Sequence, residues 1–441
     1  MKIVIVGSNH AGIAAANTIL DNNPEADVVM IDQNTNMSYL GCGTALWVGR
    51  QIESYEPLFY TNEEDFRQKG ACIHLETTVL DIDFQKREVS CQKAQDRWNE
   101  SYDKLILATG SLPISLNIPG ADLEGIHYLK LFQEGQTVDR ALDLPNVKNV
   151  AVIGGGYIGV EIAEAVRRRG KNVMIFDAAE TTLSNYYDET FTKDMDFNLT
   201  AHGIQLHLGE LAKAYEGEKR VETLKTDKGK YSVDMVISAV GFRANNDLGK
   251  NHLITLPNGA YLVNTHQQTS DSSVYAVGDC ASIYSNALDK TTYIALASNA
   301  VRTGIVAGYN AIGTKLEGNG VQGSNGISIY GLNMVSTGLS VKVAEKAGLK
   351  VSYVDHVDLQ KPAFMKENAS VKIRIVYENE SRRIVGAQVS SMENISMLIH
   401  LFSLAIEEKV TIDKLKLMDL FFLPHFDQPY NYITMAALKA K

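Results

Sequence analysis

Two stretches of the chain share one pattern of apolar and polar positions. In the first, the β-branched run Lys2–Gly7 ends in glycine, helix-forming residues follow at Ala11–Leu20, and a second apolar run spans Asp27–Asp32. A continuous apolar run that ends in glycine is typical of a buried parallel strand. The stretch therefore predicts a strand, a helix and a second strand, with the helix stopped by the Asp-Asn-Asn-Pro segment that begins at Asp21.

The same pattern returns in the middle of the chain. Asn149–Gly156 is an apolar run that ends in glycines, Tyr157–Arg169 is a predicted helix ended by Gly170, and Asn172–Asp177 is the next predicted strand. Two βαβ units so far apart predict two similar nucleotide-binding domains and not a repeat protein of short period.

The pattern changes after the glycine-rich stretch Gly318–Gly326, which we interpret as a domain boundary. Beyond it lie strand-like runs (ISIYG and VKIRIVYE), a helix-like run (LIHLFSLAIEE) and an aromatic-rich tail. The predicted fold class is therefore α/β, with two Rossmann-like dinucleotide-binding domains and a C-terminal α+β domain.

Composition narrows the class of protein. A chain of 441 residues, 45% of them hydrophobic, suits about three packed domains. A net charge of −10 without a basic block argues against binding to nucleic acid or to an anionic membrane. No apolar run is long enough for a membrane span or a secretory leader, so we expect a cytoplasmic protein.

The four cysteines lie far apart in the sequence. They form no CxxC pair, so we expect neither a metal site nor a thioredoxin-like redox pair. Without a secretory leader we also expect no disulfide framework.

Gly154, Gly156 and Gly159 fit the G-x-G-x-x-G pattern directly after a predicted strand, and Asp177 closes the next strand. Such glycines let backbone N–H groups approach a pyrophosphate at a helix N-terminus. The aspartate can accept hydrogen bonds from both hydroxyls of the adenosine ribose, and it repels a 2′-phosphate. No Lys or Arg follows it up to Leu183, so the sequence favours NAD(H) over NADP(H).

The first unit carries the same element with one departure. Gly7 and Gly12 hold the first and third glycine positions, Asn9 stands at the second, and Asp32 closes the next strand. This unit also predicts a dinucleotide site.

Two further stretches strengthen the prediction of a cofactor site. The turn Ala108-Thr109-Gly110 follows the short strand-like run KLIL. Thr269–Asp279 is interpreted as an apolar strand that ends in Gly278-Asp279. An acid at the C-terminal end of a strand is well placed to bind a cofactor polyol.

In this order the motifs resemble the flavoprotein disulfide reductases that have two dinucleotide-binding domains. The resemblance implies an FAD-binding domain built from residues 1–118 and 246–320. It implies an NAD-binding domain, residues 119–245, inserted between these parts, and a C-terminal dimerisation domain, residues 321–441. A homodimer is the implied assembly.

Cys42 departs from that superfamily, which commonly uses two cysteines close in sequence. The positions five residues away are Met37 and Trp47. A single thiol can carry two-electron chemistry through a sulfenic acid, which peroxide usually forms. We expect a helix N-terminus or a polarised neighbour to favour the thiolate first. His10, in the first phosphate loop, is expected to orient Cys42 or to exchange its proton.

The lone cysteine in SYLGCGTALWVG, with SNHAG upstream, resembles the NADH oxidase and NADH peroxidase family. The stretches TYIALASNAVRTGIVAGYNA, GVQGSNGISIYG and DLFFLPHFDQPYNYITMAAL resemble its water-forming oxidases most. The resemblance implies FAD as cofactor, NADH and O2 as substrates, Cys42 as the thiolate and sulfenic acid centre, and His10 as its partner. The implied cycle reduces O2 to peroxide, which oxidises Cys42, and a second NADH restores the thiolate.

The resemblance also implies the cofactor contacts. Asp32, Gly110 and Asp279 would bind FAD, whereas Ile158, Asp177, Tyr186 and Gly241 would bind NAD(H). Glu161 would lie near the flavin, with Tyr157 as a lid on its nicotinamide side. A helix that begins near Ala295 would point at the flavin, and Phe426 would cover the flavin of the partner subunit. The other implied cofactor-binding residues are Gly7, Asn9, His10, Ala11, Gly12, Cys42, Val79, Ala108, Thr109, Ser111, Gly154, Gly156, Gly159, Gly278, Leu296, Ala297 and Gly326.

Three alternatives remain open from the sequence. An NADH peroxidase would have the same site with poor access of O2 to the flavin. A coenzyme A-disulfide reductase would use one cysteine in mixed-disulfide exchange, but it would need a basic groove for an adenine diphosphate, and none is clear. A redox or NADH sensor would bind the nucleotides without turnover.

Overall fold

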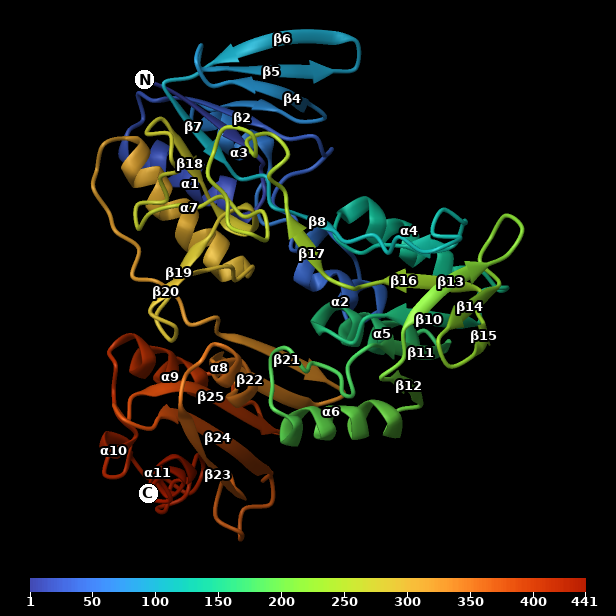
Figure 1. Cartoon of the computed structure of the whole chain (residues 1–441), viewed down its shortest axis with the longest axis vertical. Helices are drawn as coiled ribbons and strands as arrows, with labels where there is room; N and C mark the ends of the chain where they lie inside the picture. Colours follow the sequence, from blue (N-terminus) through green and yellow to red (C-terminus); the bar gives the residue numbers. More distant parts are fainter.

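The computed structural model describes residues 1–441 and arranges them in three lobes (Figure 1). The first lobe contains a parallel sheet of strand order β18-β7-β1-β2-β3. Its strands are β1 (Lys2–Val6), β2 (Asp27–Ile31), β3 (Cys72–His74), β7 (Lys104–Leu107) and β18 (Val274–Ala276). Because β18 comes from a distant part of the chain and pairs with β7, two separate segments build this lobe.

Two helices, α1 (His10–Asn22) and α7 (Ala297–Ala311), pack together in the first lobe. Glycine makes this contact close, because a Cβ at Gly304 would lie 2.3 Å from the carbonyl oxygen of Ala11. The other elements of the lobe are α3 (Glu63–Gln68), β4 (Thr78–Asp83), β5 (Glu88–Lys93), β6 (Asp96–Ser101), the short helix η3 (Gly278–Cys280), β19 (Ile283–Ser285) and β20 (Lys290–Thr292).

The second lobe repeats the parallel design, with strand order β12-β11-β10-β16-β9. Its strands are β9 (Ile126–His127), β10 (Asn149–Ile153), β11 (Asn172–Asp177), β12 (Ile204–Leu208) and β16 (Met235–Ser238). Its helices are α4 (Phe132–Asp143), α5 (Tyr157–Arg168) and α6 (Glu189–Ala201), and a small sheet joins β13 (Ala212–Glu216), β14 (Thr223–Thr226) and β15 (Lys230–Ser232). The chain enters and leaves this lobe through the paired strands β8 (Ser111–Pro113) and β17 (Phe242–Ala244) (Figure 1).

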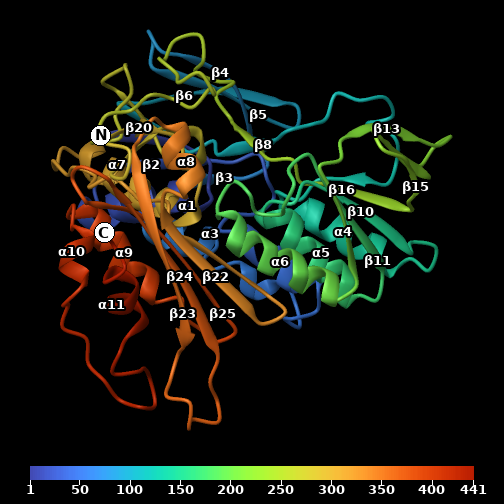
Figure 2. The same ribbon diagram turned by 60° about the horizontal axis from the view of Figure 1, so that its bottom comes forward.

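The third lobe is an antiparallel sheet of order β21-β22-β25-β24-β23, whose long strands are seen in Figure 2. They are β21 (Asn325–Ile329), β22 (Leu332–Gly338), β23 (Val351–Leu359), β24 (Ser370–Glu378) and β25 (Ile384–Ser391). Its helices are α8 (Val341–Lys346), α9 (Leu398–Glu407), α10 (Ile412–Leu415) and α11 (Tyr432–Ala437). No helix of the protein is both long and apolar enough to cross a lipid bilayer.

The segment that carries Cys42 belongs to the first lobe by sequence but packs into the core of the second. It contains the short helices η1 (Gly41–Gly43), α2 (Thr44–Val48) and η2 (Glu56–Leu58). Trp47 and Val48 share one apolar cluster with residues of α4 and α5. A Cβ at Gly49 would lie 2.9 Å from the Cα of Ala165, so α2 and α5 are in close contact.

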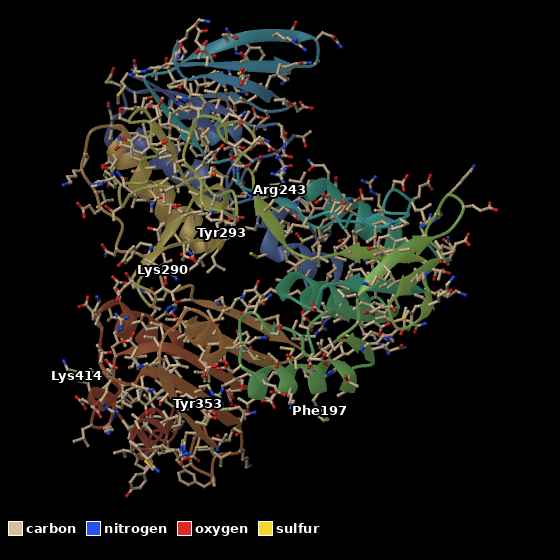
Figure 3. The ribbon with its side chains drawn as sticks, viewed as in Figure 1. Phe197, Arg243, Lys290, Tyr293, Tyr353 and Lys414 are labelled. Carbon is tan, nitrogen blue, oxygen red and sulfur yellow. The ribbon has the colours of Figure 1, made fainter.

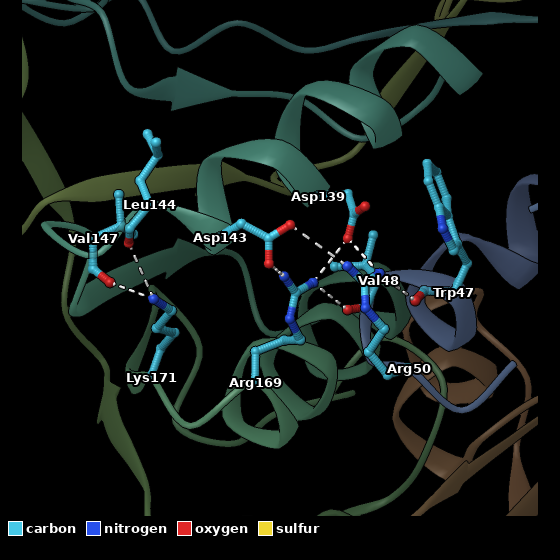
Figure 4. A network of polar contacts seen from close by, with 9 residues as sticks. All are labelled: Trp47, Val48, Arg50, Asp139, Asp143, Leu144, Val147, Arg169 and Lys171. Atoms are coloured by element: carbon cyan, nitrogen blue, oxygen red, sulfur yellow. Dashed lines mark hydrogen bonds and ion pairs between the residues drawn. The ribbon is translucent and has the colours of Figure 1, made fainter. Parts of the chain in front are cut away.

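A charged network fastens α2 to the second lobe (Figure 4). The half-buried Arg169 donates to the carbonyl oxygen of Val48 at 2.9 Å and to Asp139 at 2.8 Å, and it also pairs with Asp143. Arg50 donates to the same Asp139 at 2.6 Å. The network holds the end of α2 on two helices of the second lobe.

One predicted element is wrong in extent. Thr269–Asp279 is not a strand throughout, because β18 covers only Val274–Ala276. The residues before it form a turn, in which the Asp271 carboxylate accepts hydrogen bonds from the backbone N–H and the hydroxyl of Ser273. An aspartate that bonds to the backbone two residues further on favours a turn over a ladder. Gly278-Asp279 still follows the strand directly, in η3.

Candidate active site

The phosphate loop of the first lobe is built around glycines that cannot be replaced without strain. Gly7 has φ = +111°, and a Cβ there would lie 2.2 Å from the carbonyl oxygen of Ala108. A Cβ at Gly12 would lie 1.9 Å from the carbonyl oxygen of Gly7, so α1 packs directly on the loop. Asp32 accepts from the backbone N–H of Ser8 at 2.7 Å and from that of Asn34 at 2.8 Å. These bonds hold its carboxylate beside the loop.

The loop of the second lobe has the same construction. Gly154 has φ = +105°, and a Cβ at Gly159 would lie 1.8 Å from the carbonyl oxygen of Gly154. Asp177 accepts from the backbone N–H of Gly155 at 2.5 Å. The side of Gly156 where a Cβ would stand is open space, as close approach of a phosphate requires.

A pocket of about 260 Å³ opens at this second loop. Its lining contains no Lys or Arg and consists of Gly155, Gly156, Asp177, Ala178, Ala179, Leu183, Ser184, Asn185 and Tyr186. The pocket thus offers a carboxylate and no cation to an adenosine ribose, which suits a 2′-hydroxyl and not a 2′-phosphate.

A polar cluster joins the two lobes near the end of β18. Asp279 accepts from the hydroxyl of Ser111 at 2.8 Å, and Lys130 approaches the same carboxylate at 3.2 Å. The Lys130 ammonium also donates to Ser111 at 2.8 Å and lies 4.7 Å from the centre of the Phe242 ring. Tyr293, labelled in Figure 3, donates to the backbone oxygen of Asp279 at 3.0 Å. Neither Lys130 nor Tyr293 is predicted from the sequence.

Cys42 lies in η1, immediately before α2, with its thiol exposed. Gly43 must be small, since a Cβ there would lie 2.3 Å from Leu58. Desolvation by the surrounding protein raises the pKa of the Cys42 thiol. The negative charges of Glu161 and Asp279 raise this pKa further, whereas the positive charge of Lys130 lowers it. The chain by itself therefore favours the thiol, contrary to the expectation of a pre-formed thiolate.

Glu161, whose charge acts on Cys42, and His10, in the first phosphate loop, both have shifted pKa values. Burial raises the pKa of Glu161 to about 7, with a further contribution from the charge of Glu164. Burial lowers the pKa of His10, whose Nδ1 lies 3.0 Å from the Tyr60 hydroxyl and whose ring stacks on the Tyr60 ring. A neutral His10 and a partly protonated Glu161 are therefore expected at pH 7.

Tyr157 is the first residue of α5, directly after the glycine loop. Its ring meets that of Tyr186 edge to face, at 4.5 Å between centroids, and its hydroxyl lies 2.8 Å from the Tyr187 hydroxyl. Glu161 follows one helical turn later on the same face. This face of α5 therefore runs from the nucleotide pocket toward Cys42.

The remaining predicted residues fall into two groups. Gly110 (φ = +69°) and Gly241 (φ = +108°) lie where the chain passes between the first two lobes, next to β8 and β17. Ala295 and Leu296 precede α7, which begins at Ala297. Within one chain Phe426 lies apart from these groups, 56% exposed in the C-terminal tail, where its ring packs against Phe421. Val79 lies in β4, Gly326 lies in β21, and Asn9, Ala11, Thr109, Ile158 and Gly278 lie in or beside the loops described above.

The fold and the site define a class of redox protein with two Rossmann-type lobes and an exposed cysteine near the acids Glu161 and Asp279. The chain belongs to the pyridine nucleotide-disulphide oxidoreductases, whose model matches residues 1–304. The dimerisation domain of the same family matches residues 327–431. This family is FAD-dependent. The residues of the first lobe fit such a cofactor, because the Asp32 carboxylate stands beside the first glycine loop and Asp279 follows the end of β18.

Similar proteins are found over the full length. The chain is 60% identical to an NADH oxidase of Lactococcus lactis subsp. cremoris, with 100% of both chains covered. It is 52% identical to an NADH oxidase of Streptococcus pyogenes, over 100% of this chain and 99% of the relative. A solved structure of a water-forming NADH oxidase from Lactobacillus brevis, bound to NADH, matches with a TM-score of 0.97 and 34% identity. That match covers 99% of this chain and 97% of the other.

Proposed function

We propose that this protein is an FAD-dependent NADH oxidase that reduces O2 to water. The observation that carries the proposal is the place of Cys42, an exposed thiol that is acted on by the charges of Glu161 in α5 and of the Asp279–Lys130 pair. Full-length similarity to curated NADH oxidases and to a water-forming enzyme supports it. O2 needs four electrons to become two waters, so the reaction consumes two NADH.

The chain holds two nucleotides for this reaction. The Gly7 loop, Asp32 and Asp279 would bind FAD, and the Gly154 loop and Asp177 would bind NADH. FAD, when bound, supplies hydride acceptance from NADH and electron transfer to O2. The first pair of electrons yields H2O2, which must be retained beside Cys42.

Cys42 then removes the peroxide. The Cys42 thiol first loses its proton, and the thiolate attacks one oxygen of H2O2. The S–O bond forms as the O–O bond breaks, and the leaving hydroxide takes up a proton, equal to the one that the thiol gave, to become water. Two electrons from the second NADH, with a proton, reduce the sulfenic acid to thiolate and release the second water. Glu161, partly protonated at pH 7, is a proton source beside the sulfur.

The test is the NADH consumed per O2 by the FAD-loaded enzyme, with released H2O2 assayed in parallel. About two NADH per O2 without peroxide are expected for the wild type. Cys42→Ser should continue to oxidise NADH but release H2O2, at about one NADH per O2. Cys72→Ser, at the other exposed cysteine, is the matched control and should behave as the wild type.

Two results would contradict the proposal. Release of water alone by Cys42→Ser would remove the role of the thiol. Negligible O2 uptake by the wild type, with fast NADH oxidation after addition of H2O2, would make the protein a peroxidase.

The assembly and the location belong to the same proposal. A homodimer is supported by the matched dimerisation domain and by large exposed apolar side chains in that lobe, among them Phe364, Met397, Leu417 and Phe421. In such a dimer Phe426 would cover the flavin of the partner subunit. A cytoplasmic location agrees with four free cysteines. The division of the chain at residues 118, 245 and 320 stays a prediction, which the sheet membership of β9 and β18 supports.

A further inference from the structure

The nucleotide pocket of the second lobe covers only part of a dinucleotide. Its lining comprises residues of the glycine loop, Asp177 and residues that follow it, Tyr186 among them. Its volume of about 260 Å³ lies below the usual range of cofactor sites. Beyond Tyr186 stands Tyr157, packed edge to face against it. The pocket therefore borders the tyrosine pair and does not include Glu161 or Cys42.

Tyr157 is held in this place by a residue of the third lobe. Its hydroxyl donates to Oδ1 of Asn325, the first residue of β21. The same oxygen accepts from the hydroxyl of Ser336, its partner across the β21–β22 pair, at 3.0 Å. The amide nitrogen of Asn325 donates to the carbonyl oxygen of Gly323 at 2.7 Å, which fixes which end of the amide faces Tyr157.

Counting protons gives this chain of hydrogen bonds a direction. The Tyr157 hydroxyl has one proton, and Oδ1 of Asn325 can only accept, so the proton of Tyr157 points at Asn325. The Tyr187 hydroxyl also lies 2.8 Å from that of Tyr157, so the Tyr157 hydroxyl has two oxygen neighbours. Burial raises the pKa of Tyr157 well above its usual value, so the hydroxyl keeps its proton at any physiological pH.

We propose that Asn325 is a positioning residue that latches Tyr157 over the inner half of the NADH site, so that NADH must break the Tyr157–Asn325 hydrogen bond to reach the flavin side. The inference rests on the proposed function, because it assigns that site to NADH. It also makes access to the site depend on the third lobe, since β21 lies beside α5 and α6 (Figure 1). In a dimer, the lobe that joins the subunits would thus set the resting position of the lid.

The test measures the Kd of NAD+ for the FAD-loaded enzyme, followed by flavin fluorescence, so that no turnover is needed. Asn325→Ala removes the acceptor and with it the cost of opening, and the Kd should fall by about two- to tenfold. The KM for NADH should fall in parallel, with little change in kcat. Asn333→Ala is the matched control. Asn333 lies in the same β21–β22 hairpin, but its side-chain amide donates to the carbonyl oxygens of Gly331 and Glu393, away from Tyr157.

A double-mutant cycle identifies the bond itself. Tyr157→Phe removes the same hydrogen bond together with the contact to Tyr187, so it should lower the Kd at least as much as Asn325→Ala does. Asn325→Ala should add little in the Tyr157→Phe background, because the bond that the two residues share is already lost there. Asn325→Asp, which keeps an acceptor oxygen, should restore a Kd close to that of the wild type. An unchanged or higher Kd in Asn325→Ala, or additive effects in the cycle, would overturn the latch.

If Asn325→Ala does not fold, Tyr157→Phe and Asn325→Asp still decide the question. The NADH consumed per O2 by the wild type is measured in the same preparations. If the wild type reduces no O2, the proposed function fails, while the Kd of NAD+ still tests the latch.

Discussion

The two nucleotide-binding units of this chain share one frame, which consists of the glycine loop and the acid at the end of the next strand. They differ in the residues that surround this frame. Gly7 and Gly154 have nearly the same positive φ, and each following helix packs on its glycine loop with no room for a Cβ. Asp32 and Asp177 each accept a backbone N–H from the loop. The units differ at the first helical residue, which is His10 in one and Tyr157 in the other.

The covering of the two helices differs as well. In the first unit, α1 is covered by α7 through glycine and alanine, so these two helices are in close contact. In the second unit, α5 is covered by the short helix that follows Cys42, and Glu161 stands where α1 has Ala14. The frame is thus common to both proposed dinucleotide sites, whereas the first turn of the following helix sets which side chains stand beside each site.

The largest expected effect comes from breaking each frame in turn. Gly7→Ala puts a Cβ 2.2 Å from the Ala108 carbonyl oxygen, and Gly154→Ala puts one 2.4 Å from that of Ala239. Each also forces a left-handed φ on alanine, at about 1–2 kcal/mol. We expect Gly7→Ala to lose FAD, and with it all activity. Gly154→Ala should keep FAD but lose NADH oxidation by at least about tenfold.

Flavin absorbance per protein and the NADH-dependent rate check this separation. Gly70→Ala is the control, because Gly70 has φ = +92° but no atom within 4 Å of its Cβ position. It should keep both cofactor and rate. Loss of FAD from Gly154→Ala would show that the two frames are not independent.

A smaller effect on activity is expected from replacing Asp177, the acid at the end of the second strand of the NADH unit. Asp177→Ala combined with Ala178→Arg removes the acceptor of the ribose hydroxyls and adds a partner for a 2′-phosphate. The KM for NADH should rise by about 10- to 100-fold, the loss expected for hydrogen bonds to a charged group, and NADPH should become the better substrate. Steady-state kinetics with both nucleotides measures this ratio.

The first unit supplies the control for that experiment. Asp32→Ala should lower the FAD content without changing the preference between NADH and NADPH. A change of preference in Asp32→Ala would mean that the two sites have been assigned the wrong way round.

These frames are predictable from sequence for a physical reason. Only glycine fits without strain at a positive φ or directly beneath a carbonyl oxygen. The glycine pattern in the sequence therefore predicts the two turns, which contain Gly7, Gly12, Gly154 and Gly159. The strand–helix–strand pattern around them is local, and it agrees with β1, α1 and β2 to within two residues at each end.

The contacts between the lobes leave no such mark. Lys130 reaches Asp279 over 149 residues of sequence, and Asn325 meets Tyr157 over 168. Lys130 lies in no motif, and a lysine in a loop ordinarily faces solvent. Asn325 lies in the stretch GVQGSNGISIYG, but nothing in those residues indicates a contact with Tyr157. The pKa of Cys42 is likewise a product of tertiary placement, because Glu161 comes near it only when α2 docks on α5.

The smallest expected effect sharpens the comparison at one position, Glu161 in α5 against Ala14 in α1. Glu161→Gln removes a negative charge that raises the pKa of Cys42, so that pKa should fall. In a Cys72→Ser background, which removes the other exposed thiol, alkylation of Cys42 by iodoacetamide at pH 7 should become several-fold faster. The rate is followed against pH on the FAD-loaded enzyme, with Cys42→Ser as the blank.

The same substitution changes how stability depends on pH. The pKa of Glu161 is raised from 4.5 to about 7, so between these values the unfolded chain releases a proton that the folded chain keeps, and stability falls as pH rises. Glu161→Gln lacks this loss, and its gain over the wild type should grow from pH 5 to pH 8, by about 1–2 kcal/mol after screening. Urea unfolding at the two pH values measures it. An equal gain at both would mean that Glu161 is already ionised at pH 5, and that a proton for the Cys42 chemistry must come from elsewhere.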